Sequence, residues 1–298
     1  MKKKKKEKKI LYQLIFSAFL LFSNAYLVKA NSDILSQDST GKYCINTEQD
    51  YYNFIENIQN YNNKTVILCN DIDISDVPEA TSSFGGILNG KGHTITYASK
   101  EAKENIAVFP FRINDNGIVE NINVQIDESY AYNSETDEFQ TVFSRCDGIA
   151  KGITIKGNVT CIYDDEDTDV YIGAIEGNGT LMDSSIAITY DLQSEKTIEE
   201  IADDIVDNDL SFEFCQLGTI NTGITYQNCI GYGQYSEAIK SLADELEPKI
   251  KDNTWGYLCV SFTRKSFFST SASATNCYYD KENMPDIKIM SEYITNRD

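Results

Sequence analysis

An acidic run holds the side chains best suited by type and spacing to bind a ligand. Asp165, Asp167 and Asp169 alternate within the sequence Asp-Asp-Glu-Asp-Thr-Asp over residues 164–169. Carboxylate oxygens at alternating positions of a loop suit a hard cation such as Ca²⁺. The loop lacks the later glycine and bidentate glutamate of an EF-hand, and acidic runs also occur as plain solvated charge. These aspartates are a calcium-site hypothesis, and calcium is the only cofactor that the sequence suggests.

His93 is the single histidine of the chain and the first residue to test as a catalytic base. It follows a glycine-punctuated turn, and no serine or cysteine nucleophile motif accompanies it. We therefore expect a structural role for His93, and we assign no catalytic residue from the sequence.

Tyrosine is abundant, with 19 residues in the chain. Aromatic rings on a flat sheet can stack against sugar rings or protein surfaces. If the chain binds a ligand in this way, the sequence points to Tyr171, Tyr226 and Tyr232. The alternative is that tyrosines fill corners and edges of the fold.

A repeated pattern must position all these residues. Glycine followed by a short apolar segment begins units at Gly117, Gly148, Gly179 and Gly223, with two steps of 31 residues and a longer third step. Apolar residues then alternate with polar ones, which is typical of half-buried strands. Short strands recurring at this period favour coils of a parallel β-helix over a sandwich, in which hairpin signals should dominate.

Three helices are predicted around this repeat. Residues 48–60 follow a capping-box-like start and should cap the open N-terminal end of the stack. Residues 196–208 and 236–247 carry apolar residues at helical spacing and are predicted as insertions. We predict an all-β chain: a single-stranded, right-handed parallel β-helix with a capping helix and helical insertions.

The N-terminus reads as a secretory signal. Residues 1–30 hold a lysine-rich start, an apolar run and a Val-x-Ala exit, so we expect cleavage there. An uncleaved anchor is the alternative, because the apolar run is long. A flexible segment over 31–40 and one β-helix domain over 41–298 would follow.

Charge limits the partners of the exported chain. After removal of residues 1–30 it would hold 18 basic and 45 acidic residues, a net charge of −27. Nucleic acid is then an unsuitable partner, since its phosphates would be repelled. We expect membrane contact only through the signal, and a monomer.

All eight cysteines lie after the signal, and an even number in an exported chain favours disulfides. In the repeat register Cys229 should lie directly above Cys277, at a strand spacing that a disulfide can span. Cys215 and Cys259 recur at a similar distance. The remaining neighbours give the bridges Cys44–Cys69 and Cys146–Cys161.

Two segments resemble a known family. Val-Ile-Leu-Cys-Asn-Asp-Ile-Asp-Ile over 66–74 and Phe-Gly-Gly-Ile-Leu-Asn-Gly-Lys-Gly-His-Thr-Ile over 84–95 are similar to the opening of secreted bacterial β-helix proteins of the pectin-lyase-like fold with GLUG-type repeats. The sequence at 275–280 is similar to their last coils, whereas the repeat starts near 107–110 and 141–144 depart from the family pattern. The resemblance implies the fold, and it raises an alternative: polysaccharide cleavage, with Arg112 or Arg145 as the base of a lyase, or with clustered carboxylates in a hydrolase.

The function we expect is non-catalytic. No ladder of acidic residues recurs at one register over three coils, which disfavours a hydrolase. A secreted or cell-surface binding or adhesion module for a glycan or a cell-surface protein is the favoured interpretation. The alternatives are a polysaccharide lyase or glycoside hydrolase on the same fold, and a structural spacer.

Overall fold

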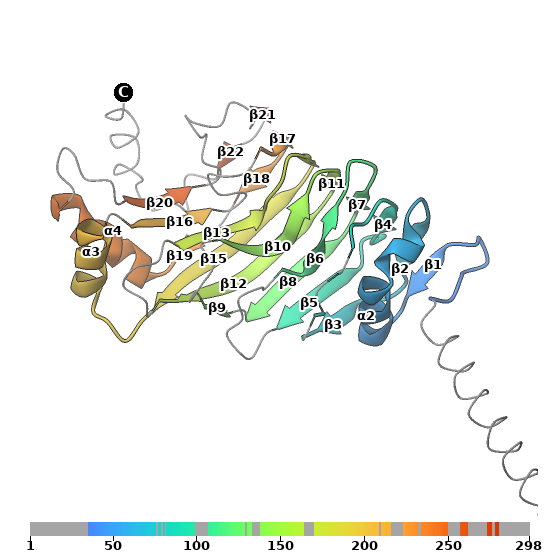
Figure 1. Ribbon diagram of the computed structural model, residues 1–298, viewed down its shortest axis with the longest axis horizontal. Coiled ribbons are helices and arrows are strands. Elements are labelled where there is room, and N and C mark those ends of the chain that lie inside the picture. Colours follow the sequence, from blue (N-terminus) through green and yellow to red (C-terminus); the bar gives the residue numbers. More distant parts are fainter. Residues whose placement is uncertain are drawn as a thin grey trace, which may run out of the picture.

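The computed structural model describes residues 35–75, 77–78, 80, 82–98, 107–128, 130–132, 138–163, 170–208, 210–215, 223–231, 234–249, 257–261, 273–275 and 278–279. The described chain is rich in strands, which form three long parallel sheets that we call A, B and C. The sheets follow the long axis of the molecule (Figure 1).

Sheet A contains β1 (Tyr43–Ile45), β2 (Thr65–Leu68), β4 (Ile87–Asn89), β7 (Ile118–Glu120), β11 (Ile149–Lys151), β14 (Thr180–Met182), β17 (Thr225–Gln227) and β21 (Ser273–Thr275). Sheet B contains β3 (Ile72–Ile74), β5 (Thr94–Ala98), β8 (Asn123–Glu128), β12 (Thr154–Ile162), β15 (Ser185–Gln193), β18 (Ile230–Gly231) and β22 (Tyr278–Tyr279), with β9 (Tyr130–Tyr132) and β19 (Gln234–Tyr235) beside it. Sheet C contains β6 (Phe109–Ile113), β10 (Glu138–Cys146), β13 (Val170–Ile175), β16 (Ser211–Cys215) and β20 (Tyr257–Ser261).

The chain visits the sheets in a fixed order. From β4 onward it passes through A, B and C and then returns to A, and each strand pairs in parallel with the matching strand of the next pass. We call one such pass a round. The predicted repeat is therefore real: Ile118 lies opposite Ile149, and Ile149 lies opposite Thr180, in steps of 31 residues.

The fourth repeat is one residue away from its predicted start. Thr180 pairs with Thr225, so Ile224 rather than Gly223 follows Gly179 in register. The step from Thr180 to Thr225 is longer because α3 (Ile198–Asp207) is inserted within this round. Strand pairing sets the register here, and the glycine does not.

The core lies between the three sheets. Inward positions of successive strands carry apolar side chains, and in sheet A the central row of Val66, Leu88, Val119, Ala150, Leu181 and Tyr226 is buried throughout. Period-two alternation accounts for this row, since every second residue of a strand points inward.

The turn between sheets A and B explains the Asn, Gly and Asp residues of the repeat. Asn121, Gly152, Asp183 and Asn228 occupy matching places and all have positive φ, between 51° and 62°. Only glycine adopts this left-handed conformation without cost, and Asn and Asp tolerate it better than other residues. One such residue in each round redirects the chain from sheet A to sheet B.

The turn between sheets C and A contains a stack of glycines. Gly86, Gly117, Gly148 and Gly179 follow one another in register, and the backbone N–H after each later glycine donates to the carbonyl oxygen of the glycine one round earlier, as from Ile149 to Gly117 at 3.0 Å. A Cβ on Gly117, Gly148 or Gly179 would collide with carbonyl oxygens of the preceding round. The repeat glycines are required by close backbone approach.

The predicted N-terminal helix is divided into α2 (Glu48–Glu56) and the 3₁₀ helix η1 (Ile58–Tyr61). The Thr47 side chain accepts a hydrogen bond from the Asp50 amide and so caps α2. Phe54 is buried, and its ring lies 5.4 Å from the rings of both Tyr61 and Phe84. Helix α2 therefore covers apolar side chains at one end of the stack (Figure 1).

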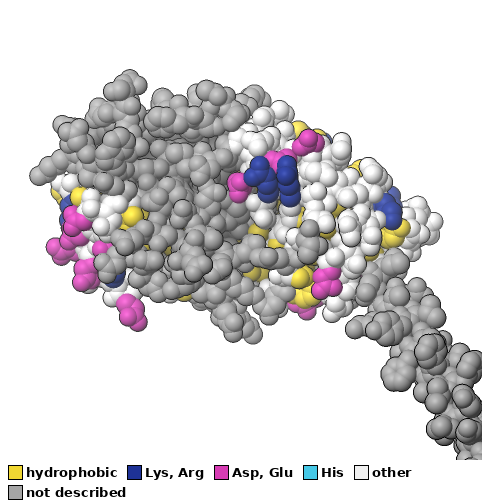
Figure 2. Space-filling model, viewed as in Figure 1, with side chains coloured by type: hydrophobic (Ala, Val, Ile, Leu, Met, Phe, Trp, Pro, Cys, Tyr) yellow, Lys and Arg dark blue, Asp and Glu magenta, His cyan; other side chains and the backbone are white. Residues whose placement is uncertain are grey.

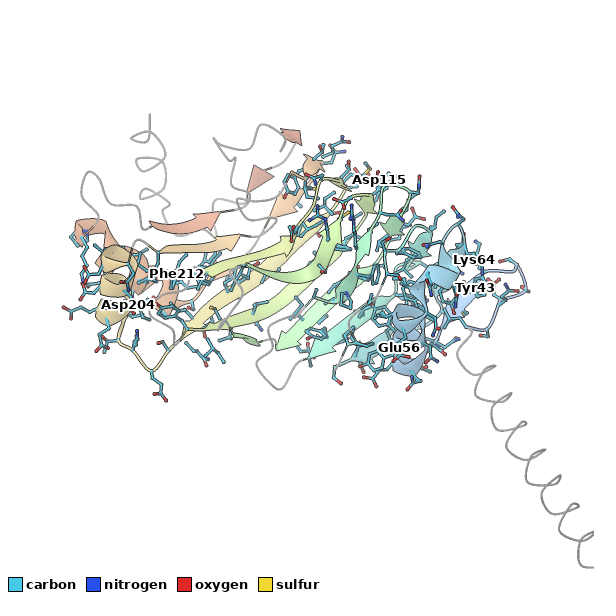
Figure 3. The ribbon with its side chains drawn as sticks, viewed as in Figure 1. Tyr43, Glu56, Lys64, Asp115, Asp204 and Phe212 are labelled. Carbon is cyan, nitrogen blue, oxygen red and sulfur yellow. A yellow bond between two sulfur atoms is a disulfide. The ribbon has the colours of Figure 1, made fainter. Side chains whose placement is uncertain are left out.

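Both predicted insertions are helices, α3 and α4 (Glu237–Lys249), and both lie between a sheet B strand and a sheet C strand. Lys249 of α4 pairs with Asp203 of α3 at 2.7 Å. The Tyr163 ring contacts Phe212 edge-on at 4.9 Å, and its hydroxyl donates to Asp204 of α3. Figure 3 shows Asp204 and Phe212 on the same side of this end of the molecule. The helices are thus attached to the sheets without interrupting the strand register.

Candidate functional site

Arg112 and Arg145 form the most distinctive charged group. They lie directly opposite each other on β6 and β10 of sheet C, as predicted from their places in consecutive repeats. Asp147 pairs with Arg112 Nε at 2.6 Å and with Arg145 Nε at 3.1 Å, and Arg145 Nη1 reaches Glu176 Oε1 at 3.0 Å. We call these four residues the arginine cluster. Figure 2 shows basic side chains beside acidic ones on the face drawn.

Asp147 is the centre of this cluster. Its side chain is only 6% exposed, and its Oδ1 also accepts a hydrogen bond from the Asn178 amide at 3.1 Å. Burial raises the pKa of Asp147, but the hydrogen bonds from Arg145 and Asn178 and the positive charge of both arginines outweigh it, so the pKa lies below its ordinary value. One ionised carboxylate therefore holds three successive rounds together.

The cluster offers little acid–base chemistry. An arginine base needs a neutral guanidine, whereas ion pairs with Asp147 and Glu176 stabilise the protonated form. Asp147 with a lowered pKa is also a poor general acid at neutral pH. The lyase alternative that the resemblance raised gains no support from Arg112 or Arg145.

His93 also links two rounds. Its Nδ1 lies 3.1 Å from Asp71 Oδ1, which accepts a second hydrogen bond, from the Thr94 amide, at 2.8 Å. These bonds, with the Thr94 amide contributing most, lower the pKa of the exposed Asp71 carboxyl. The geometry agrees with the structural role expected for His93.

The tyrosine hypothesis is wrong for Tyr226, which is fully buried in the inward row of sheet A. Its neighbours Thr225 and Gln227 point outward instead. The backbone of Tyr171 lies in β13 opposite Glu138 and Glu213, but its side chain and all of Tyr232 lie outside the described residues. The sequence signal that could have placed Tyr226 correctly is the alternation of its own strand.

The calcium hypothesis is untested, since Asp165, Asp167 and Asp169 lie outside the described residues. Within the residues that the structure covers, no group of three or more His, Cys, Asp or Glu side chains is arranged to hold a metal ion. The same covered residues contain no helix long and apolar enough to cross a membrane, and the predicted signal over 1–30 is not among them.

The predicted disulfide Cys44–Cys69 is confirmed, with the two Cα atoms 5.9 Å apart. Cys44 lies in β1, the first strand of sheet A, and Cys69 follows β2. The bridge therefore fastens the outermost strand of the sheet to its neighbour.

The predicted bridge Cys146–Cys161 is wrong. Both residues are buried thiols: Cys146 ends β10 of sheet C, and Cys161 lies near the end of β12 of sheet B. Their closeness in sequence misled the prediction because the chain crosses sheet A between them.

The other two pairings fall partly outside the described residues. Cys277 is among the residues not described, but Ile230 pairs with Tyr278 and Thr225 with Ser273, so the strands on both sides keep the 48-residue offset that the bridge Cys229–Cys277 requires. For Cys215 and Cys259 the backbone register differs from the prediction. Cys215 lies opposite Ser261 and Cys259 opposite Glu213, two residues out of step. This offset gives a Cα separation of roughly 8 Å, which is too long for a disulfide.

Removing the confirmed bridge should destabilise the protein. The paired substitutions Cys44→Ala and Cys69→Ala release a cross-link with a sequence separation of 25 residues, and closing such a loop is worth about 3 kcal/mol. We expect the free energy of unfolding, measured by chemical denaturation, to fall by about this amount. An unchanged denaturation midpoint would show that β1 is held by other contacts.

The two buried thiols should be unreactive in the folded chain. Burial raises the pKa of Cys146 and of Cys161 to about 12, so almost no thiolate is present at pH 8. Peptide mapping after maleimide treatment should find both unlabelled in the native protein and labelled in denaturant. Rapid native labelling of either residue would contradict its described burial.

The outer face of sheet B differs from the arginine cluster. Buried Ile95, Val124, Ile155 and Ile186 point inward, so the residues beside them point outward. Outward residues form three in-register rows: Thr94, Asn123, Thr154 and Ser185; Thr96, Gln125, Lys156 and Ala187; and Asn158, Thr189 and Gln234. We call these eleven residues the polar rows. All are partly or fully exposed, and Lys156 is their only charged member.

No family model matches this chain, and a search of curated proteins finds no match. The resemblance to β-helix proteins with GLUG-type repeats therefore stays a prediction.

Proposed function

We propose that this chain is an exported right-handed parallel β-helix protein that binds a glycan or a cell-surface protein without cleaving it. The fixed order of visits to sheets A, B and C supports this fold class, since parallel strands joined in this way are nearly always connected with right-handed geometry. The resemblance to secreted bacterial GLUG-repeat proteins favours the same class. The disulfide Cys44–Cys69 suits an oxidising compartment, as a secreted protein would occupy.

The polar rows are the observation that carries the binding function. They give a flat surface of hydroxyl and amide groups at fixed spacing, held by continuous parallel pairing of β5, β8, β12 and β15. Rigid display lowers the entropy lost when a partner binds. The charged groups of sheet C, in contrast, neutralise one another within the arginine cluster.

Surface binding tests this proposal. The purified chain, labelled with a fluorophore, would be applied to a glycan array and to intact bacterial and host cells, with an unrelated acidic protein of similar size as the control. We expect retention above the control on at least one surface. Retention equal to the control on every surface would contradict a binding module and favour a structural spacer.

A further inference from the structure

We infer that the polar rows on sheet B bind an uncharged polysaccharide chain. This inference rests on the proposed binding function and adds to it a site and a ligand class. The surface, its charge and its rigidity each contribute to the argument.

The arrangement matches a ligand with a regular repeat. Thr94, Asn123, Thr154 and Ser185 lie side by side on four consecutive strands, so this row is about 14 Å long at the usual strand spacing. The next row runs parallel to it, two residues further along each strand, or about 7 Å away. A polysaccharide presents hydroxyl groups at regular intervals, and hydroxyl and amide side chains can both donate and accept hydrogen bonds.

Charge selects against acidic ligands. Ten of the eleven residues in the polar rows are uncharged, although the whole chain has a net charge of −20. Three carboxylates border the rows: Asp73 opposite Thr96, Asp127 at the end of β8, and Asp191 on β15. An acidic polymer would meet this negative border, whereas an uncharged one would not be repelled.

The side chains are also restricted before any ligand arrives. Threonine is β-branched and has few χ1 rotamers, and Thr94, Thr96, Thr154 and Thr189 supply four of the eleven positions. The Asn123 side chain is held by a hydrogen bond to the Gly92 carbonyl oxygen at 2.7 Å. A surface ordered in this way loses little conformational entropy on binding.

A pair of matched double variants tests the site. Gln125→Ala with Thr154→Ala removes two diagonal neighbours from the polar rows on β8 and β12. Thr180→Ala with Gln227→Ala makes the same two changes at diagonal neighbours on the outer face of sheet A. All four residues are exposed to some degree, so thermal melting should verify that both variants fold as the parent does.

Affinity electrophoresis of the full chain in mixed-linkage β-glucan and in galactomannan, with polygalacturonate and chondroitin sulfate as acidic polymers, gives the readout. We expect retardation by a neutral polymer, about fivefold or more weaker binding for the sheet B variant, and binding within about twofold of the parent for the sheet A variant, because two hydrogen bonds are lost only from the site. Oligosaccharides of increasing length should bind progressively better until they span the rows.

The outcomes separate the site from the general function. Neutral-polymer binding that survives in the sheet B variant would overturn the polar rows as the site while leaving a glycan-binding module. Retardation by the acidic polymers alone would overturn the uncharged ligand. Retardation by no polymer, with retention on cells in the surface assay, would overturn this inference and leave a protein-binding module; failure of both assays would overturn the proposed function as well.

Discussion

Replacing Gly148 with alanine is expected to lower the free energy of unfolding by about 3 kcal/mol or more, or to prevent folding. The new Cβ would collide with the carbonyl oxygens of Gly117 and Asn114. Those oxygens belong to backbone that is fixed by the hydrogen bonds between rounds, so neither can move without disturbing the next pass of the chain. Chemical denaturation measures the effect.

Gly85→Ala is the matched control, since Gly85 lies near the same turn of an earlier round. Its Cβ would meet only the Asn114 side chain, at 2.7 Å, and a side chain can rotate away. We expect a loss of about 1 kcal/mol. Equal stability losses at Gly85 and Gly148 would contradict a stacking role for the glycines of this turn.

Replacing Asp147 with alanine is expected to cost about 1.5–3 kcal/mol, the range for hydrogen bonds that involve charged groups. The substitution leaves Arg112 and Arg145 as adjacent like charges on neighbouring strands, with one of their two carboxylate partners gone. Asp115→Ala is the control, because Asp115 is an exposed aspartate in the preceding turn between sheets C and A, labelled in Figure 3. It should be nearly neutral.

The loss at Asp147 should depend on pH. The folded-state pKa of Asp147 lies below its ordinary value, so ionised Asp147 stabilises the folded chain at every pH above the unfolded-state pKa of about 3.9. That stabilisation disappears as the pH falls through the folded-state pKa. The difference in stability between the parent and Asp147→Asn should therefore be constant from pH 5 to 7 and shrink in acid. A difference that grows in acid would contradict the lowered pKa.

Periodicity made the architecture predictable. Gly117, Gly148 and Gly179 recur every 31 residues, and the structure stacks them in register. The physical need for glycine was not visible in the sequence, since it comes from carbonyl oxygens one round away. Gly223 was misplaced because the length of an inserted helix cannot be inferred from the positions of glycines.

The same period held a signal for the arginine cluster that the sequence prediction missed. Glu176 lies 31 residues after Arg145, so one repeat step separates the two ends of their ion pair. Asp147 could not be found in this way, because it reaches sideways from a turn to both arginines. Periodicity finds partners along a row, whereas contacts across a turn require the folded backbone.

The disulfides show the same distinction. Cys44 and Cys69 are one round apart and are bonded, whereas Cys146 and Cys161 are close in sequence but belong to different sheets. In a chain that visits three sheets in turn, neighbours in space are separated by a whole round. Pairing by sequence closeness fails where pairing by register succeeds.

Binding without cleavage is the central claim, and product release measures it most directly. The purified chain would be incubated with each retained glycan, with and without calcium, and both new reducing ends and unsaturated products would be counted over many hours. We expect the glycan to be bound and recovered intact. Products that accumulate in proportion to the amount of protein, and that disappear in Arg112→Gln or Arg145→Gln variants that still fold, would contradict the claim and establish a polysaccharide-cleaving enzyme.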